Sequence, residues 1–244
     1  MARAFLFLLL ATSLVLAAAC SPGSSDDDSS SNGGAGGLSG TWNGTIENPS
    51  FLLGAITVVL DGSSITVTTP DGTQGGSFAQ EQGNIHGFQL ADGTLGGFMT
   101  DSAGSHAGFV DEEFYFGAVQ KGASVLNTSN SSNFSSSDIA GSWSGTTVEL
   151  TGADMGISEV YSSNASVGTD WYISGSDSYG SYSGSVQNYD GRYGRYDFEV
   201  YSGSETYVGG QFLTQDKLFA AGYSCPQSVG YYLSYCGFTI WNKQ

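Results

Sequence analysis

The sequence predicts an all-β protein made of two tandem, small, antiparallel up-and-down β-barrels. Three observations predict it: apolar residues alternate along short segments, Asp-Gly pairs separate those segments, and one sequence pattern occurs twice. Alternation is typical of strands that bury one face. It is seen in four places: Ile56, Val58 and Leu60; Ile65 and Val67; His86, Phe88 and Leu90; and Phe114, Phe116 and Ala118.

Asp-Gly pairs punctuate the alternating segments and predict hairpin turns. They are Asp61-Gly62, Asp71-Gly72, Asp92-Gly93 and Asp190-Gly191. Glycine supplies the positive φ that tight hairpin turns require. With about eight strands in the first half, a sheet would leave unpaired edges unless it closed on itself. We therefore expect barrels, with two-sheet β-sandwiches as the alternative.

The repeat shows that the chain contains two copies of one unit. Leu38–Thr45 returns as Ile139–Thr146, and the ending Phe116–Lys121 returns as Phe238–Lys243. Between them, Phe98-Met99-Thr100 and Ala107-Gly108-Phe109 match Phe212-Leu213-Thr214 and Ala221-Gly222-Tyr223 at the same internal spacing. The doublets Gly96-Gly97 and Gly209-Gly210 precede Phe98 and Phe212, which favours a structural use for them.

Composition places the boundaries between these units. Residues 122–137 are rich in Ser and Asn and have the composition of a flexible linker. The first barrel is therefore expected at 38–121 and the second at 138–244. Each is large enough for one modest hydrophobic core.

The amino terminus has the features of an export signal. Arg3 precedes an apolar run that ends in Ala17-Ala18-Ala19-Cys20, which predicts a signal peptide over 1–19 and a Ser/Gly/Asp tether over 20–37. Small residues before a cysteine resemble the lipobox of bacterial lipoproteins. The resemblance implies that Cys20 carries diacylglycerol and palmitate, and Ser21 resembles the outer-membrane sorting pattern. The alternative is an ordinary secretory signal with an incidental cysteine.

Export also bears on the other two cysteines. Cys225 and Cys236 would reside in an oxidising compartment, where a disulfide persists. The alternative is a pair of free thiols on paired strands.

The charge of the chain argues against polyanionic partners. With six Lys or Arg against 23 Asp or Glu, the formal net charge is −17. Such a chain repels phosphate backbones, so no nucleic acid partner is expected. The expected contact is with a lipid bilayer, through the Cys20 anchor.

A short motif at the start of each unit resembles a known group of barrels. Gly40-Thr41-Trp42 and Gly141-Ser142-Trp143 look like the Gly-x-Trp signature of the lipocalins and wider calycins. The resemblance implies that Trp42 and Trp143 each close one end of a barrel. The Gly-Gly-Phe segments and the acylated tether are also similar to barrel lobes of bacterial surface lipoproteins.

The sequence offers little for catalysis or metal binding, so we expect neither an enzyme nor a cofactor. Serine hydrolases need a serine at the centre of Gly-x-Ser-x-Gly, and the two look-alikes place Trp143 and Tyr182 there. His86 and His106, with Asp101 or Asp111, could approach one another, but the usual metal-ligand spacing is absent. Residues 111–113 are three consecutive acids, typical of a solvated turn.

Tyrosine provides the candidate binding residues. All but Tyr115 of the 14 tyrosines lie in the second unit. An exposed cluster would suit contact with a protein or glycan, and the candidates are Tyr179, Tyr182, Tyr189, Tyr193, Tyr201 and Tyr207. The alternative is that tyrosine is simply a good strand residue. The expected function is non-enzymatic binding or surface interaction, with an envelope-assembly role or a lipocalin-like carrier of a small apolar ligand as alternatives.

Overall fold

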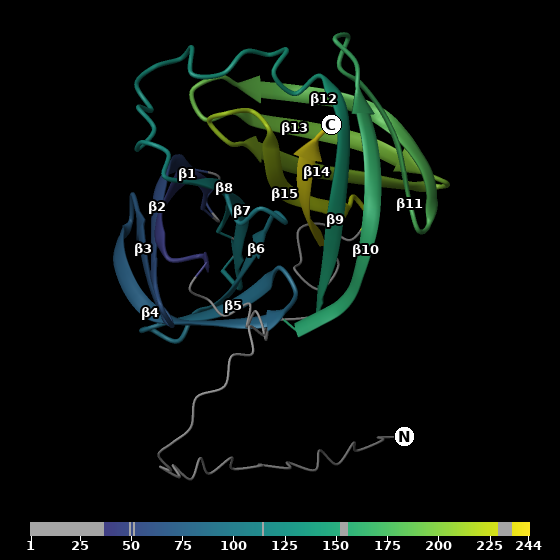
Figure 1. Ribbon diagram of the computed structural model, residues 1–244. Helices are drawn as coiled ribbons and strands as arrows, with labels where there is room; N and C mark the ends of the chain where they lie inside the picture. Colours follow the sequence, from purple (N-terminus) through teal and green to yellow (C-terminus); the bar gives the residue numbers. More distant parts are fainter. Residues whose placement is uncertain (1–36, 49, 51, 114, 152–155, 229–235) are drawn as a thin grey trace, which may run out of the picture. The chain divides into compact units, whose positions relative to one another are not determined.

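The computed structural model describes residues 37–48, 50, 52–113, 115–151, 156–228 and 236–244, and they all belong to one compact unit (Figure 1). Cys20, the signal segment and nearly all of the tether lie outside the described residues. The first eight strands are β1 (Gly40–Glu47), β2 (Leu53–Asp61), β3 (Ser64–Thr69), β4 (Gly72–Gln82), β5 (Ile85–Leu90), β6 (Leu95–Thr100), β7 (His106–Asp111) and β8 (Phe116–Lys121). The next eight are β9 (Gly141–Thr151), β10 (Gly156–Val167), β11 (Tyr172–Asp177), β12 (Gly180–Asp190), β13 (Arg195–Ser202), β14 (Glu205–Leu213), β15 (Phe219–Pro226) and β16 (Gly237–Lys243).

Each set of eight strands closes into its own antiparallel barrel, which confirms the predicted fold class over the sandwich alternative. Neighbours in sequence are neighbours in the sheet, and closure comes from β1 pairing with β8 and from β9 pairing with β16. Closure removes the unpaired edges that an open meander would present. Within the described residues, no helix has the length and apolar character needed to cross a bilayer.

Three of the four Asp-Gly turns have the expected backbone. Gly62, Gly72 and Gly93 have φ values of 59°, 145° and 101°. The fourth turn differs, because its positive φ falls at Gly194, not at Gly191. Arg192 reaches back to the Asp190 carboxylate through Nε at 3.1 Å and Nη2 at 2.7 Å, which holds a longer turn.

The two Gly-x-Trp tryptophans occupy the same position in their barrels. Trp42 and Trp143 are buried, and each indole N–H donates to a carbonyl four residues earlier, on Leu38 at 3.1 Å and on Ile139 at 2.8 Å. A lysine from the last strand lies over each ring, Lys121 at 5.7 Å and Lys243 at 5.3 Å from the ring centroid. Both rings pack into the core of their own barrel near the start of the first strand.

Large side chains fill the interior of the first barrel. Trp42, Phe78 and Phe98 pack edge to face, and Phe88 stacks on Phe109 with centroids 5.0 Å apart. Inward aliphatic side chains from β1, β2 and β3 complete this core: Ile46, Ile56, Val58, Leu60, Ile65 and Val67. The alternation predicted for β2, β3 and β5 is thus confirmed, since those residues face the interior.

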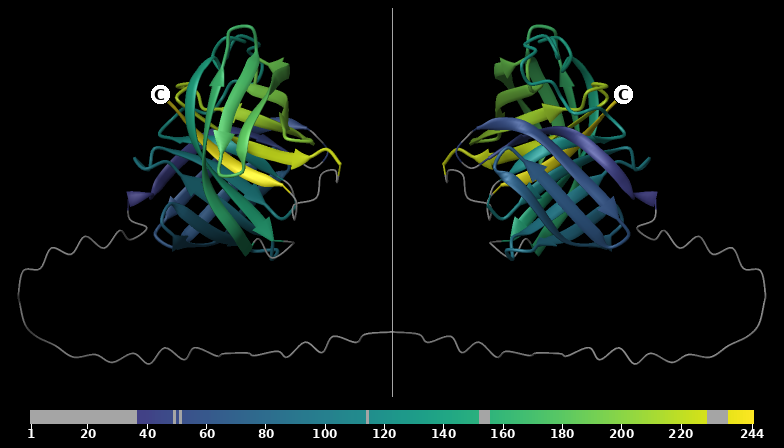
Figure 2. Two further views of the ribbon diagram at one scale, coloured as in Figure 1. Left: turned by 90° about the vertical axis from the view of Figure 1, so that its right-hand side faces the viewer. Right: turned by 90° about the vertical axis from the view of Figure 1, so that its left-hand side faces the viewer.

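A second apolar layer lies between the barrels (Figures 1 and 2), where β7 and β8 pack on β14, β15 and β16. Phe116 of β8 contacts Phe212 and Tyr223, with ring centroids 5.5 and 4.4 Å away. Gly108 allows this approach, because a Cβ there would lie 2.7 Å from the Phe238 ring. Phe116 and Ala118 therefore alternate as predicted, but they face the other barrel instead of their own interior.

The segment between the barrels is packed, although its composition is that of a flexible linker. Leu126 and Phe134 are buried in the core of the second barrel. Tyr196 donates from its hydroxyl to the Ser135 carbonyl at 2.8 Å, and Asn133 donates to the Arg192 carbonyl at 2.9 Å. Two apolar anchors and these hydrogen bonds fix an otherwise polar segment.

The strand register shows that one part of the sequence alignment between the two units is shifted by one residue. Phe98 pairs with His86 and Phe109, whereas the residue in the same ladder position of the second barrel is Gln211, which pairs with Tyr196 and Gly222. The following turns agree, with positive φ at Gly104 and at Lys217. Phe98 therefore corresponds to Gln211 and not to Phe212. A one-residue slip moves side chains to the opposite face.

The disulfide expected in the second barrel is present. Cys225, at the end of β15, is bonded to Cys236, just before β16, and both are buried. It closes a loop with a sequence separation of 11 residues.

Replacing both cysteines by serine should lower the free energy of unfolding by about 3 kcal/mol, because the unfolded chain then regains the entropy of the open loop. Urea unfolding at equilibrium measures the change, and reduction of the unaltered protein should reproduce it. Equal stability of the oxidised, reduced and serine forms would contradict a stabilising role.

Candidate functional site

The interior of the second barrel holds a cavity of about 370 Å³. Its walls come from inward residues of β9 to β16, and its floor includes Trp143, Val167, Ile173 and Val186. The Glu149 end of β9 lies at the far end of the barrel from Trp143. Pockets of this size commonly hold small molecules.

Comparison of the two ladders explains why the second interior leaves this space. Gly44 pairs with Ile56 and Trp42 with Val58, whereas Gly145 pairs with Ser163 and Trp143 with Ala165. At four further equivalent positions the second barrel has a smaller or polar residue. Thr147 stands in place of Ile46, Val186 in place of Phe78, Gln211 in place of Phe98, and Gly222 in place of Phe109. Smaller side chains at these inward positions leave volume that the first barrel fills.

Glycines on the wall let aromatic side chains lie inside the barrel. A Cβ on Gly175 would come within 2.3 Å of the Tyr182 ring, and one on Gly145 within 2.6 Å of the Trp241 ring. A Cβ on Gly209 would come within 2.6 Å of the Phe198 ring. These glycines therefore place three aromatic side chains against the cavity.

Three of the six candidate tyrosines line this cavity: Tyr179, Tyr182 and Tyr207. Tyr161 and Tyr196 line it as well, although they were not among the candidates. The alternation over 195–201 was a usable signal for Tyr196, because it places Tyr196, Phe198 and Val200 on one face, and all three line the cavity. Tyr161 stands in a Ser-rich stretch with no alternation of large apolar residues to reveal its face.

The other three candidates lie elsewhere, so the six do not form one patch. Tyr189 is half-buried and donates to the Phe134 carbonyl in the segment between the barrels. Tyr193 packs against the layer between the barrels, beside Arg192. Tyr201 is exposed and donates to Glu199 on its own strand.

Carboxylates and tyrosines gather at the end of the cavity farther from Trp143, which is its open end as far as the described residues go, since Tyr179 there is exposed. Glu149 and Asp177 line it, and the Tyr161 and Tyr179 rings meet edge to face at 5.2 Å. Burial, together with the charges of Glu159 and Asp177, raises the pKa of Glu149 against the effect of its hydrogen bond with Tyr161. The hydrogen bond to Glu159, 2.5 Å long, raises the pKa of Tyr179 to about 12. This end of the cavity is therefore negatively charged and aromatic.

Deeper in the cavity lie a few polar groups. The Thr147 hydroxyl shares hydrogen bonds with Thr239 at 2.8 Å and Ser163 at 3.3 Å. The Trp241 indole N–H is buried and has no acceptor among the described residues. Buried N–H groups normally have partners, so this donor is an exception within the barrel.

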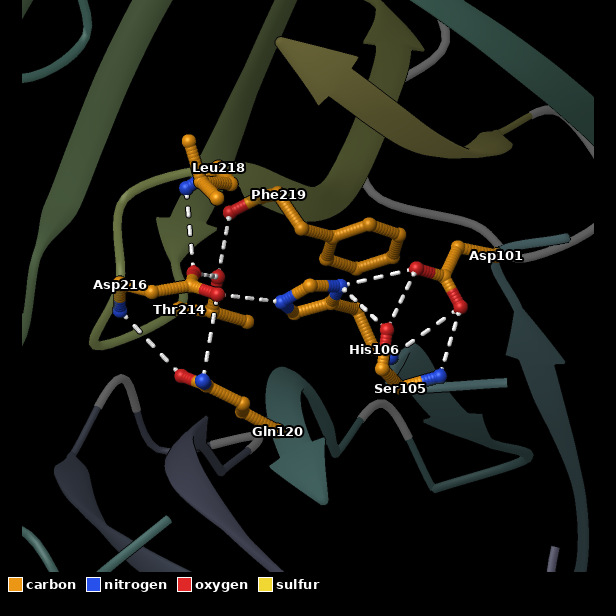
Figure 3. Close-up of polar contacts among 8 residues, drawn as sticks. All are labelled: Asp101, Ser105, His106, Gln120, Thr214, Asp216, Leu218 and Phe219. Carbon is orange, nitrogen blue, oxygen red and sulfur yellow. Dashed lines mark hydrogen bonds and ion pairs between the residues drawn. The ribbon is translucent and has the colours of Figure 1, made fainter. Parts of the chain in front are cut away.

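A second polar cluster joins the two barrels around His106 (Figure 3). Nδ1 of His106 lies 2.8 Å from the Asp101 carboxylate of its own barrel, and Nε2 lies 2.6 Å from the Asp216 carboxylate of the second barrel. The imidazole stacks on Phe219 with centroids 5.4 Å apart. The imidazole thus lies between one carboxylate from each barrel and links the two barrels.

The His106 cluster has the wrong geometry for a hydrolytic relay. Ser105 and Asp101 approach the same ring nitrogen, at 3.3 and 2.8 Å, whereas a relay needs serine and carboxylate on opposite nitrogens. Burial raises the pKa of Asp101 and Asp216, but hydrogen bonds from His106 and from backbone N–H groups outweigh it and lower both. The cluster therefore stabilises the junction when its carboxylates are ionised.

Another ion pair crosses the same junction. Arg195 of β13 donates through Nε to Glu47 of β1 at 2.7 Å, and both side chains are buried. Burial raises the pKa of Glu47 to about 7, against the opposing charge of Arg195. The guanidinium also lies 5.6 Å from the Phe116 ring centroid and 5.4 Å from that of Phe212, within the apolar layer.

Of the residues considered for metal binding, His106 and Asp101 come together, whereas His86 and Asp111 do not join them. His86 is buried in the first barrel and stacks on Phe78 at 5.3 Å, away from the His106 junction. Asp111 accepts backbone N–H groups of Glu113 and Tyr115, both at 3.0 Å, so it caps a turn; it is buried, not solvated. Across the described ranges, no group of three His, Cys, Asp or Glu side chains is placed to hold a metal ion.

Comparisons with known proteins give a weak likeness in structure. No family model matches the sequence, and no curated protein matches it. A protein of unknown function from the DUF3598 family of Nostoc punctiforme is similar in structure at 11% identity and a TM-score of 0.37, covering 85% of this chain and 97% of that one. That likeness is too low to transfer a fold or a function.

Replacing His106 by Gln should lower the free energy of unfolding by about 2–4 kcal/mol at pH 7, because charge-assisted hydrogen bonds between the barrels are lost. Stability due to Asp101 and Asp216 is present above their ordinary pKa of 3.8 and is lost as the pH falls through their lowered values. The deficit of the variant should therefore shrink towards pH 2 to 3.

Urea unfolding across this pH range tests the junction. Asp190→Asn, which removes the Arg192 partner at the surface, is the control and should cost less than about 1 kcal/mol. A deficit for His106→Gln that is equal at pH 7 and pH 2.5 would contradict a link that depends on ionised Asp101 and Asp216.

Proposed function

We propose that this protein is a lipid-anchored, non-enzymatic carrier whose second barrel binds a small, largely apolar ligand. The observation that supports it most is the cavity of about 370 Å³ in the second barrel, at inward positions where the first barrel is filled. Its lining is mainly aromatic and aliphatic, with polar side chains such as Thr147, Ser163 and Gln211 among them, and such a mixture is typical of small-molecule sites.

The first barrel and the junction have a supporting role in this proposal. The filled barrel provides a rigid surface against which β14, β15 and β16 pack, and the disulfide fixes the end of β15 to the start of β16. A cavity lowers stability because its lining loses packing contacts. Packing against the first barrel and the disulfide offset this loss of stability.

The tyrosine distribution favours a carrier over a protein or glycan adhesin. A flat exposed patch would suit adhesion, but the candidate tyrosines divide among the cavity, the segment between the barrels and the outer surface. The anchor at Cys20 would hold this carrier at the bacterial outer membrane.

Filling the cavity should abolish ligand binding. Ser163→Ile with Ala165→Val installs the side chains that the first barrel carries at the same ladder positions. With the neutral apolar fluorophore N-phenyl-1-naphthylamine as probe, we expect at least an about tenfold weaker Kd, since inserted methyl groups take up its space. Fluorescence titration of the full chain carrying Cys20→Ala measures it.

The matched control makes the same changes on the outer face of β10, where Ser162 and Ser166 are exposed. Ser162→Ile with Ser166→Val should leave the Kd for the probe unchanged. If the unaltered protein does not bind the probe, or the inward and outward variants bind it equally, the second barrel is not the carrier site.

The lipid anchor is tested separately. Metabolic labelling with palmitate should label the unaltered protein, and Cys20→Ala should remove the label and release the protein from the membrane fraction, because diacylglycerol is attached through the Cys20 thiol. Cys225→Ala with Cys236→Ala is the control and should keep the label. Label that persists in Cys20→Ala would contradict the proposed anchor.

A further inference from the structure

The open end of the cavity combines aromatic rings with negative charge. Tyr161, Tyr179, Tyr182 and Tyr207 all line the cavity beside Asp177. The charge of Asp177 contributes to the raised pKa of each of these four tyrosines, so the carboxylate lies within electrostatic range of every ring. Glu149 lines the same end.

Fixed positive charge is absent from the described lining of the cavity, which includes no Lys or Arg. The five basic residues of the described ranges make contacts elsewhere. Lys121 and Lys243 lie over the barrel-closing tryptophans, Arg195 is paired with Glu47, and Arg192 with Asp190. Lys217 is paired with Asp138. A ligand that enters the cavity therefore meets negative charge at its open end.

The tyrosine hydroxyls at this end are already engaged. Tyr179 donates to Glu159 at 2.5 Å, and Tyr182 donates to the Asn164 carbonyl at 2.9 Å. What these two residues offer a ligand is the ring. Aromatic rings next to carboxylates attract organic cations, through the ring quadrupole and the full charges together.

The deeper cavity specifies the rest of the ligand. Its floor is apolar, and Trp241 pairs with Gly145, four residues along β9 from Glu149, which is roughly 13 Å of strand. A ligand that spans this depth would carry its charge at the open end and an apolar body inside.

We infer that the ligand is an organic cation, an amine with an apolar, preferably aromatic, body, whose ammonium group lies among Tyr161, Tyr179, Asp177 and Glu149. This inference rests on the proposed function, because it specifies the ligand of the same cavity. The residues that would recognise the charge lie at the open end, and those that would hold the body lie below them.

Three naphthalene probes of nearly equal size test the charge preference: 1-naphthylmethylamine, which is a cation at pH 7, neutral 1-naphthylmethanol, and anionic 1-naphthaleneacetate. Calorimetric titration of the full chain carrying Cys20→Ala measures the three Kd values. We expect the cation to bind about tenfold more tightly than the alcohol, the anion to bind most weakly, and added salt to reduce the preference.

Asp177→Asn keeps the oxygen that accepts the Tyr179 and Gly180 N–H groups and removes only the charge. It should weaken binding of the amine about fivefold to tenfold and leave the alcohol unchanged. Asp61→Asn, at an exposed turn of the first barrel, changes the net charge equally and should change neither Kd.

The outcomes separate the two proposals. If none of the probes binds, the carrier function itself fails. If the alcohol or the anion binds as tightly as the amine, or if Asp177→Asn and Asp61→Asn weaken the amine equally, the cavity binds ligands but the preference for a cation is wrong.

Discussion

Closure of each sheet by pairing of its first and last strands is the constraint on which the rest of the molecule depends. Once β1 pairs with β8 and β9 with β16, no edge is left, and each strand has one face inside its barrel and one outside. Side-chain volume at alternate positions then decides whether the interior is solid or hollow. The outer faces decide how the barrels meet.

The first barrel has a solid interior and the second a hollow one, although both have the same strand arrangement. In the first, Phe98 and Phe109 fill the interior; in the second, Gln211 and Gly222 stand at the same ladder positions. The outer faces of β8 and β15 are apolar in both and form a shared layer. A hollow barrel that is packed against a solid one keeps its shape without filling its own interior.

Basic residues lie at structural positions, whereas acidic residues line the end of the cavity. The chain is strongly acidic, and its few described basic residues lie at structural positions, over the closing tryptophans or in ion pairs such as Arg195 with Glu47 at the junction. The described lining of the cavity contains no Lys or Arg, and its open end carries Asp177 and Glu149. The selectivity that we infer for an organic cation follows from this placement.

The sequence by itself determined the features that depend on local pattern. Alternation, Asp-Gly turns and the repeat predicted two closed barrels, because strand periodicity and turn geometry depend on residues close together in the sequence. The cysteine count predicted the disulfide, because only two cysteines remain once Cys20 is assigned to the lipid. Tertiary structure alone decided which faces meet and where space remains. The one-residue difference between Phe98 and Gln211 depends on the register of neighbouring strands. The burial of Phe116 against the other barrel and the meeting of His106 with Asp216 depend on packing between residues more than 90 positions apart. A period of two shows which residues share a face of the strand with a given tyrosine. Only the closed barrel shows whether that face lines a cavity, packs on the neighbouring barrel or is exposed to water.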